Sequence, residues 1–191
     1  MNPFDRISTR YRHFPEVDVT KGRSIAHSRS STRRMMELID ANGQGNVHGG
    51  AIMRMVDEAA AIVALKHSQS PTVVTARVER FDFLAPAFIG DVVSVHCTMH
   101  YVGRTSMEVG VEVTAEDVIS QEIRKIASSY VIYVALDENR NPRPVPPLEP
   151  ADEAEAQIIA QAQLRRQQRK KIDEEFQRMQ QDIVDKHTAA E

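Results

Sequence analysis

The feature that most constrains the fold is one long stretch of helical periodicity with apolar residues on most sides. From Gly49 or Gly50 to about His67, apolar residues recur at helical spacing. Such a helix has roughly 19 residues and a length of about 28 Å. One stripe consists of Ile52, Val56, Ala59, Ala60 and Val63, and the other sides carry Met53, Met55, Ala61, Ile62 and Ala64. A helix with this distribution is expected to be buried on nearly all sides.

After Pro71 the apolar pattern changes to a period of two, which is typical of half-buried strands. The short connections between the strands favour an antiparallel meander. The strands with this pattern are predicted over 72–83, 92–101, 107–114 and 123–136, and the segment Thr32–Ile39 could begin the sheet.

The strand predicted over 72–83 changes its parity along its length. Its apolar positions are first Val74 and Val78 and then Phe81 and Phe83, which predicts a β-bulge between them. Because no second helix is available as a layer, we expect the sheet to curl around the long helix in an α+β arrangement. A helix lying on a flat sheet is the rival arrangement, and self-association could also cover the helix.

The remaining sequence divides into tails and a linker. Residues 1–30 are basic but contain acids such as Asp5 and Glu16, so they are predicted to form a flexible arm or an extra edge strand rather than a transit peptide. The folded domain is expected over 31–137, and the proline-rich segment 138–151 is expected to be a stiff extended linker. The segment 152–187 is predicted to be a separate charged helix with an apolar stripe formed by Ile172, Phe176, Met179 and Ile183.

Composition excludes several classes of protein. Cys97 is the single cysteine, so no intramolecular disulfide can form, and no zinc-type spacing of cysteine and histidine occurs. A formal net charge of -3 gives no global basic field for nucleic acid. The first residues lack the apolar core of a signal peptide, and no stretch reaches the length of a membrane span. We therefore expect a cytoplasmic protein with no metal, no nucleic-acid partner and no membrane contact.

A glycine pair begins the long helix, and one carboxylate follows within the apolar stretch. Backbone N–H groups in the first turn of a helix have no intrahelical partner, and glycine lets a ligand approach them closely. Gly49 and Gly50 therefore offer donors for the developing oxyanion of an acyl transfer. Asp57 lies among small apolar neighbours, where a carboxylate is costly, and is the candidate for chemistry. Glu58 follows Arg54 by four residues and is predicted to pair with it.

Each of these residues also has a structural interpretation. Asp57 could be neutralised by Arg54 or bonded to a facing backbone amide. The glycine pair could form only a tight turn into the helix. His48 could be a surface or cap residue, and Asn46 could be an ordinary turn residue.

Several motifs between residues 42 and 137 occur in the order found in one family. They are G-N-V-H-G-G, V-D-E-A-A-A-I, A-R-V-E-R-F-D-F-L-A-P, I-G-D-V-V and Y-V-G-R-T-S-M-E-V. In these motifs the chain resembles the acyl-CoA thioesterases of the hotdog superfamily, notably the brain-type acyl-CoA hydrolase and its short bacterial relatives. The resemblance implies a hotdog fold, in which an antiparallel sheet wraps around one long central helix.

The resemblance also implies a reaction and an assembly. Asp57 would act as general base or as nucleophile in the hydrolysis of acyl-CoA, with fatty acyl groups as the expected substrates. Asn46 would contribute from the opposite protomer, and the backbone of Gly49 or Gly50 would polarise the thioester carbonyl. The site would therefore span the interface of a homo-oligomer, expected as a trimer of dimers, and the reaction would need no cofactor.

CoA carries phosphates, which arginine and lysine side chains bind well. The residues predicted to contact the substrate are His48, Arg77, Arg80, Arg104, Thr105 and Ser106.

Two other functions fit the same fold. One is a non-catalytic acyl-CoA-binding regulatory module, although no helix-turn-helix pattern precedes the domain. The other is a dehydratase of hydroxyacyl thioesters with a catalytic histidine at the turn, for which His48 is the candidate.

Overall fold

The computed structural model describes residues 16–188, with side chains described as far as residue 181. The first half of the predicted N-terminal arm, including Asp5, lies outside the described residues, and so does the side chain of Ile183 in the C-terminal stripe. The chain divides into two compact units, the first ending at Ala151 and the second beginning at Asp152. The second unit contains one helix, α4 (Glu153–Thr188). Ile172, Phe176 and Met179 on that helix are exposed.

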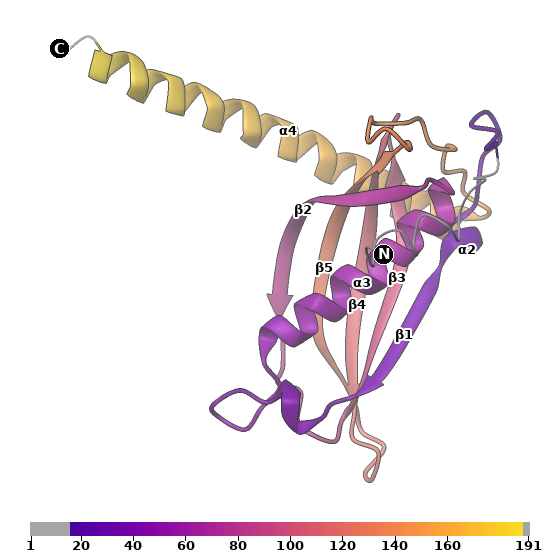
Figure 1. Cartoon of the computed structure of the whole chain (residues 1–191), viewed down its shortest axis with the longest axis vertical. Helices are drawn as coiled ribbons and strands as arrows, with labels where there is room; N and C mark the ends of the chain where they lie inside the picture. The colour runs from indigo at the N-terminus through magenta and orange to yellow at the C-terminus, as the bar shows by residue number, and fades with distance from the viewer. Residues whose placement is uncertain (1–15, 189–191) are drawn as a thin grey trace, which may run out of the picture. The chain divides into compact units, whose positions relative to one another are not determined.

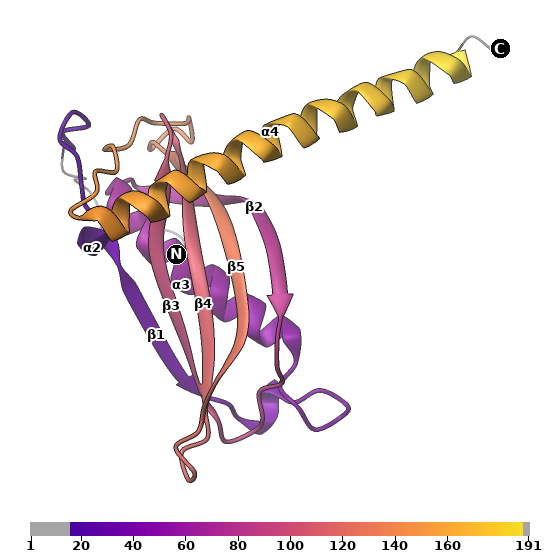
Figure 2. The same cartoon turned by 180° about the vertical axis from the view of Figure 1, so that it is seen from behind.

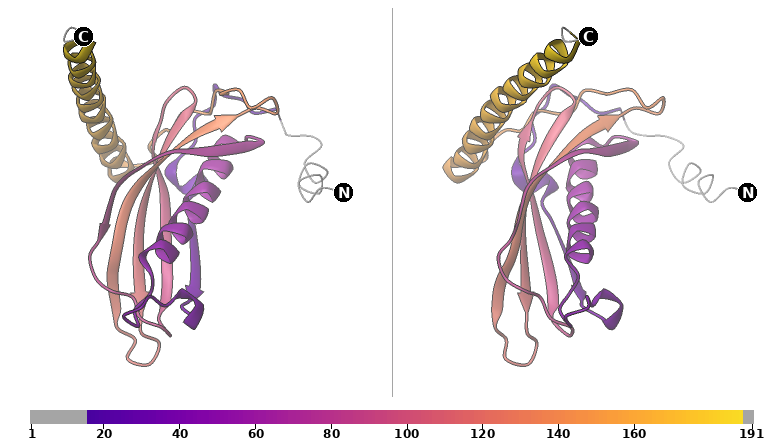
Figure 3. Two further views of the ribbon diagram at one scale, coloured as in Figure 1. Left: turned by 60° about the vertical axis from the view of Figure 1, so that its left-hand side comes forward. Right: turned by 90° about the vertical axis from the view of Figure 1, so that its left-hand side faces the viewer.

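The first unit is a five-stranded antiparallel sheet that curves around one long helix (Figure 1, Figure 3). The strand order is β1-β3-β4-β5-β2, as the view from behind shows (Figure 2). The long helix, α3 (Gly49–Ser68), contacts all five strands. The strands are β1 (Ser30–Met35), β2 (Thr72–Phe83), β3 (Val92–Val102), β4 (Ser106–Glu116) and β5 (Ile123–Leu136), and two short helical turns are α2 (Ile25–Ser28) and η1 (Leu38–Asp40). The expected hotdog arrangement is confirmed.

The strand expected over Thr32–Ile39 is wrong in its limits. β1 ends at Met35, and Leu38–Asp40 form a turn of 3-10 helix. The side chains of Glu37 and Asp40 form a capping box there, because each carboxylate accepts a hydrogen bond from the backbone of the other residue. Satisfied backbone groups stabilise this turn, and they end the strand before the apolar pattern ends.

The bulge predicted in β2 is confirmed. The pairing of β2 with β5 changes register between Glu79 and Asp82, and Arg80 has a positive φ of 46°. A second register shift, between Thr75 and Arg77, was not apparent from the apolar pattern. Both irregularities lie in an edge strand, where such departures from regular pairing are common.

The burial of α3 differs from the sequence-based expectation. Ala60 and Val63 face the sheet and are fully buried, whereas Met53, Ile62 and Leu65 are 43%, 38% and 38% exposed. The prediction that the helix is buried on nearly all sides is therefore wrong for the single chain. The sheet covers one side of α3, and the opposite side is open and mixed, with the apolar Met53, Ile62 and Leu65 beside the charged Arg54, Asp57, Glu58 and Lys66.

The proline-rich segment, which was expected to be an extended linker, is part of the first unit and is hydrogen-bonded to the rest of it. Arg143 N donates to Ala135 O at 2.9 Å and Val145 N donates to Arg104 O at 3.0 Å. Arg23 N donates to Pro147 O at 2.9 Å. We refer to residues 142–149 as the strap.

His67, at the C-terminal end of α3, is fully buried beneath the strap. Its Nε2 lies 3.0 Å from Pro146 O, and its own carbonyl accepts a hydrogen bond from the Arg23 guanidinium. Burial lowers the pKa of His67 to about 4. The imidazole is therefore neutral near pH 7. Among the described residues no helix is long and apolar enough to cross a membrane.

Candidate functional site

Asp57 lies in the middle of α3, on the side that faces away from the sheet centre, and is exposed in the single chain. Thr75 Oγ1 of β2 donates a hydrogen bond to Asp57 Oδ1 at 2.7 Å. Tyr133 OH of β5 lies 2.8 Å from Asp57 O and 3.1 Å from Asp57 Oδ1. Thr75 and Tyr133 are register partners across the β2–β5 pair. Two hydroxyl groups from neighbouring strands thus hold one carboxylate oxygen.

The structural interpretation of Asp57 required Arg54 or a backbone amide as its partner. Arg54 Nε instead binds Glu58 Oε1 at 2.9 Å, which confirms the predicted pair. Among the described residues, the recorded partners of the Asp57 carboxylate are the two hydroxyl groups. Its charge is therefore not neutralised by a cation within the single chain.

Tyr133 remains a hydrogen-bond donor at ordinary pH. Burial, and after it the negative charge of Asp57, raises the pKa of Tyr133 well above the usual value of a phenol. Its side chain is almost fully buried, with 1% of the residue exposed. The hydroxyl therefore presents a proton to Asp57 from a fixed ring.

The N-terminus of α3 provides backbone donors. His48 is the N-cap residue, and its Nδ1 accepts a hydrogen bond from Gly50 N at 2.9 Å, which confirms the cap interpretation. Gly50 N–H is therefore already satisfied. Within the described part of the chain, Gly49 N–H has no recorded acceptor. A Cβ on Gly49 would lie 3.1 Å from Phe83 Cζ, so glycine permits the close approach of this ring.

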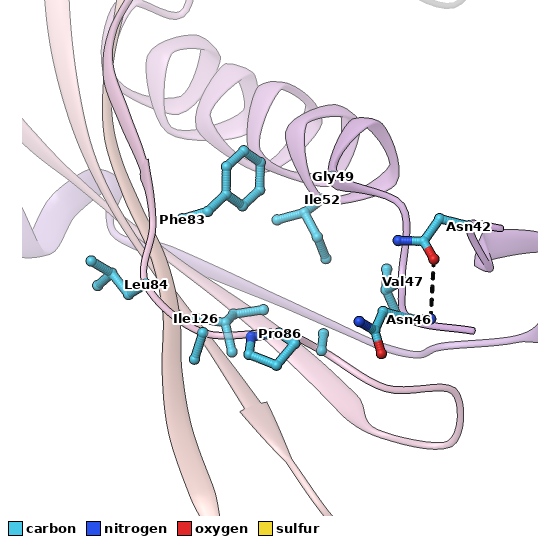
Figure 4. A pocket seen from close by; sticks show the side chains of 11 residues that line it. Asn42, Asn46, Val47, Gly49, Ile52, Phe83, Leu84, Pro86 and Ile126 are labelled. Carbon is cyan, nitrogen blue, oxygen red and sulfur yellow. Dashed lines mark hydrogen bonds between the residues drawn. The ribbon is translucent and has the colours of Figure 1, made fainter. Parts of the chain in front are cut away.

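A cavity of about 380 Å³ opens beside Gly49 (Figure 4). Asn42 and Asn46 line it from the turn that precedes α3, and Asn42 Oδ1 accepts hydrogen bonds from Gln44 N at 2.8 Å and Asn46 N at 3.2 Å. The volume is within the usual range for a ligand pocket. The rest of the lining is Val47, Ile52, Phe83, Leu84, Ala85, Pro86, Ala87 and Ile126, which makes the cavity mainly apolar.

The single chain does not bring the predicted catalytic residues together. Asp57 follows Gly49 by eight residues, which is a rise of about 12 Å along a helix. Asp57 does not line the cavity that contains Asn46 and Gly49. Within one chain, the Asp57 carboxylate therefore lies outside the cavity that Gly49 and Asn46 line.

The predicted substrate contacts lie in two further places. Arg77 and Arg80 are exposed on β2, and they pair with Glu79 at 3.2 Å and Asp82 at 3.0 Å. The turn between β3 and β4 lies at the opposite end of the sheet from the start of α3 (Figure 1), and it contains Arg104 and Thr105, with Ser106 as the first residue of β4.

Thr75 and Tyr133 were missed by the sequence analysis. A signal for Tyr133 was present, because it shares the inward phase of β5 with the buried Val131 and Ala135. A tyrosine in a buried strand position usually finds a partner for its hydroxyl. Thr75 gave no comparable signal, since a threonine is ordinary in an exposed strand.

The side chains described hold no group of three or more His, Cys, Asp or Glu residues that could bind a metal ion.

Comparison with known proteins gives one family. The model of the thioesterase superfamily matches residues 44–120. An uncharacterized acyl-CoA thioester hydrolase of Bacillus subtilis is 37% identical over 139 residues, which are 73% of this chain and 80% of that protein. The human cytosolic acyl coenzyme A thioester hydrolase is 39% identical over 110 residues. Those residues are 55% of this chain but 29% of the human protein, so the chain spans about a third of that relative.

Solved structures agree with this result. A hexameric acyl-CoA thioesterase in its apo form superposes with a TM-score of 0.77 at 35% identity, covering 80% of this chain and 97% of the other. An acyl-CoA hydrolase of Staphylococcus aureus, solved with coenzyme A and with an asparagine replaced by alanine, has a TM-score of 0.78 at 32% identity, covering 86% and 98%. Further variants of that hydrolase replace an aspartate or a threonine. The replaced asparagine precedes the replaced aspartate by fifteen residues.

Proposed function

We propose that this chain hydrolyses acyl-CoA to a free acid and CoA. The premise is that the chain belongs to the hotdog acyl-CoA thioesterases of the thioesterase superfamily. The observation that carries the proposal is the Asp57 carboxylate, which two hydroxyl groups hold at the open side of α3. A carboxylate that is held by two hydroxyl groups, and that pairs with no cation among the described residues, is well suited to accept a proton or to attack a carbonyl carbon.

The reaction has two forms that use the same residues. In the first, Asp57 takes a proton from water and the resulting hydroxide attacks the thioester carbonyl carbon; the C–S bond then breaks and the CoA thiolate takes up a proton. In the second, Asp57 attacks the carbon itself, the C–S bond breaks and CoA leaves as its thiolate, which takes up a proton. Water then hydrolyses the anhydride, which releases the free acid and restores the Asp57 carboxylate. Gly49 N–H stabilises the oxyanion in both forms, because Gly50 N–H is already bonded to His48.

The asparagine of the site is Asn42 in this proposal, in place of the expected Asn46. Asn42 precedes Asp57 by fifteen residues and Asn46 precedes it by eleven. The fifteen-residue spacing is the one between the asparagine and the aspartate that were replaced in the Staphylococcus aureus hydrolase. Both asparagines line the cavity beside Gly49, so both are included in the test below.

We further propose that each site is formed by two copies of the chain. β2 is an edge strand with exposed apolar residues, including Val74 and Val78, and it lies beside the open side of α3. A second copy placed there would cover these residues and bring its own cavity to Asp57. The hexameric relatives support a homo-oligomer, and a trimer of dimers is the arrangement that we propose.

The remaining details of the proposal concern substrate and location. Fatty acyl groups would occupy the apolar cavity, and the CoA phosphates would be bound by arginines among Arg77, Arg80 and Arg104, with Thr105 and Ser106 as hydroxyl donors. A cytoplasmic location is supported by the name of the mammalian relatives. It also fits Cys97, whose pKa burial raises to about 12, so that the thiol stays protonated.

The experiment is a thiol-release assay with acyl-CoA substrates from acetyl to palmitoyl. Replacing Asp57 by Asn should lower kcat by roughly 10²–10⁴-fold, because the amide cannot accept the proton. Glu58→Gln is the matched control, since Glu58 is the neighbouring acid and pairs with Arg54 instead of contacting Asp57. Asn42→Ala should lower activity more than Asn46→Ala. Full activity of Asp57→Asn would refute the assignment.

A further inference from the structure

We propose that Tyr133 is a positioning residue which, together with Thr75, holds Asp57 by Oδ1 and leaves Oδ2 as the oxygen that reacts. This inference rests on the proposed thioesterase activity, because it names which atom of the carboxylate takes the proton or attacks the carbonyl. It predicts a role for a tyrosine that lies in the hydrophobic core.

The first observation is how the two oxygens of the carboxylate are used. Oδ1 accepts Thr75 Oγ1 at 2.7 Å and lies 3.1 Å from Tyr133 OH. Within the described residues, Oδ2 has no recorded hydrogen-bond partner. Since both hydroxyl groups approach the same oxygen, the carboxylate has one preferred orientation, and the lone pairs of Oδ2 stay available.

The second observation is how Tyr133 contacts Asp57. A phenol has a single hydrogen, and Tyr133 OH lies within hydrogen-bond distance of both the backbone O and Oδ1 of Asp57, at 2.8 and 3.1 Å. The hydrogen is therefore shared between the main chain and the side chain of the same residue. Such a contact limits rotation of the Asp57 side chain relative to its own backbone.

The third observation is the rigidity of the donor. Tyr133 is 1% exposed and belongs to the core cluster that also contains Met107 and Val131. β5, which carries it, is paired on one side with β4 and on the other with β2. A buried ring in a central strand cannot follow a moving carboxylate, so it fixes the carboxylate instead. Its raised pKa keeps the hydroxyl protonated, as the contact requires.

The charged groups near Asp57 on its own helix do not replace this arrangement. Arg54 and Glu58 bind each other at 2.9 Å, with side chains that are 81% and 62% exposed. On the facing strands, the groups that reach the carboxylate are the hydroxyls of Thr75 and Tyr133. Orientation of a reacting group by rigid neighbours is one of the larger contributions to catalysis.

The chain offers a matched control in Tyr130. It lies on the same strand, but it is on the opposite phase from Tyr133 and is half-buried, with its ring near that of His100 at 5.9 Å between centroids. Tyr130→Phe removes one hydroxyl from β5 as Tyr133→Phe does, without touching Asp57.

The experiment measures kcat, KM and Tm for the full chain with butyryl-CoA and palmitoyl-CoA. Tyr133→Phe should lower kcat about tenfold with KM changed less than about twofold, because an oriented hydrogen bond to the base is lost while the substrate contacts stay. Thr75→Val should also lower kcat, and Thr75→Ser, which restores the hydroxyl, should recover most of it. Tyr130→Phe should have the kcat of the unchanged chain.

The outcomes separate this inference from the proposed activity. If Asp57→Asn is inactive while Tyr133→Phe and Thr75→Val both keep full kcat, the thioesterase proposal stands and the positioning role is wrong. If Tyr133→Phe loses activity only in proportion to a lower Tm or a smaller folded fraction, the residue is structural and the inference is also wrong. If the unchanged chain releases no thiol from any acyl-CoA, the proposed function itself fails.

Discussion

The two sides of α3 have the same periodic apolar pattern in the sequence, but they differ in how far the rest of the chain buries them. On the sheet side, Ala60 and Val63 are fully buried. On the open side, Ile62 and Leu65 are each 38% exposed and lie on the same helix as Asp57. The sheet side is completed by the chain itself. The open side has exposed apolar side chains around a carboxylate that Thr75 and Tyr133 hold. Exposed apolar residues of this kind are expected where a second copy of the chain binds.

The largest effect is expected from placing a charge on the sheet side. Val63→Asp should lower the free energy of unfolding by roughly 4 kcal/mol or more, since Val63 is 0% exposed and a new carboxylate there would be buried among apolar side chains. Urea denaturation followed by circular dichroism measures this. Val63→Ala, which removes only methyl groups, should cost about 2 kcal/mol. A Val63→Asp variant as stable as the original chain would show that this side is not the core.

The second effect is a pH dependence of the free energy of unfolding, which tests the burial of His67 at the C-terminal end of α3. Burial lowers the pKa of His67 from 6.5 to about 4 in the folded chain, so the unfolded chain binds a proton that the folded chain does not. Stability should therefore be full above pH 6.5 and should fall as the pH drops from 6.5 to 4, by about 3 kcal/mol in total. His67→Gln should have a flatter stability profile over this window. Identical profiles for the two chains would contradict the assignment.

The third effect tests the open side. Ile62→Asp should leave the far-UV circular dichroism unchanged but should weaken self-association by roughly 10- to 100-fold, the equivalent of one apolar side chain withdrawn from an interface. Sedimentation velocity over a range of protein concentrations measures this. Ile119→Asp is the matched control, because Ile119 is 90% exposed in the turn between β4 and β5. If both variants keep the mass of the original chain, the open side is not the interface.

The smallest effect concerns the ion pair on the open side. Arg54→Met should change Tm by less than about 2 °C, because exposed pairs of this kind contribute little and are screened by salt. A large loss in Tm that persists at high salt would mean that this pair is not solvent-exposed in the assembled protein.

The elements that the sequence predicted well are those in which apolar residues recur with a regular helical or strand period. The helix beginning at Gly49 and the strand ending at Leu136 have the expected limits, and the parity change in β2 located the bulge at Arg80. The end of β1 was not predictable in this way. Leu38 and Ile39 continue the apolar run but are 83% and 87% exposed, because the capping box between Glu37 and Asp40 outweighs their strand preference.

The site was predictable only in its local parts. Asp57 stood out because a carboxylate is costly in an apolar helix, and the cap role of His48 follows from its place before the glycines. The hydroxyl partners of Asp57 are 18 and 76 residues away in sequence, so Thr75 and Tyr133 come together only through the β2–β5 register. Asn42 and Asn46 lie in one turn, and no local rule distinguishes them. Our proposal of Asn42 depends on the fifteen-residue spacing in the Staphylococcus aureus hydrolase.

The strap sets where the chain can be shortened. A chain that stops at Asp137 keeps all five strands but loses the partners of Arg23, Arg104 and His67. We therefore expect a stable shortened chain to need the residues up to about Glu149, whose backbone N–H donates to Arg23 O at 3.0 Å. The prolines after the sheet belong to the folded body, and shortened versions of this protein are best ended behind them.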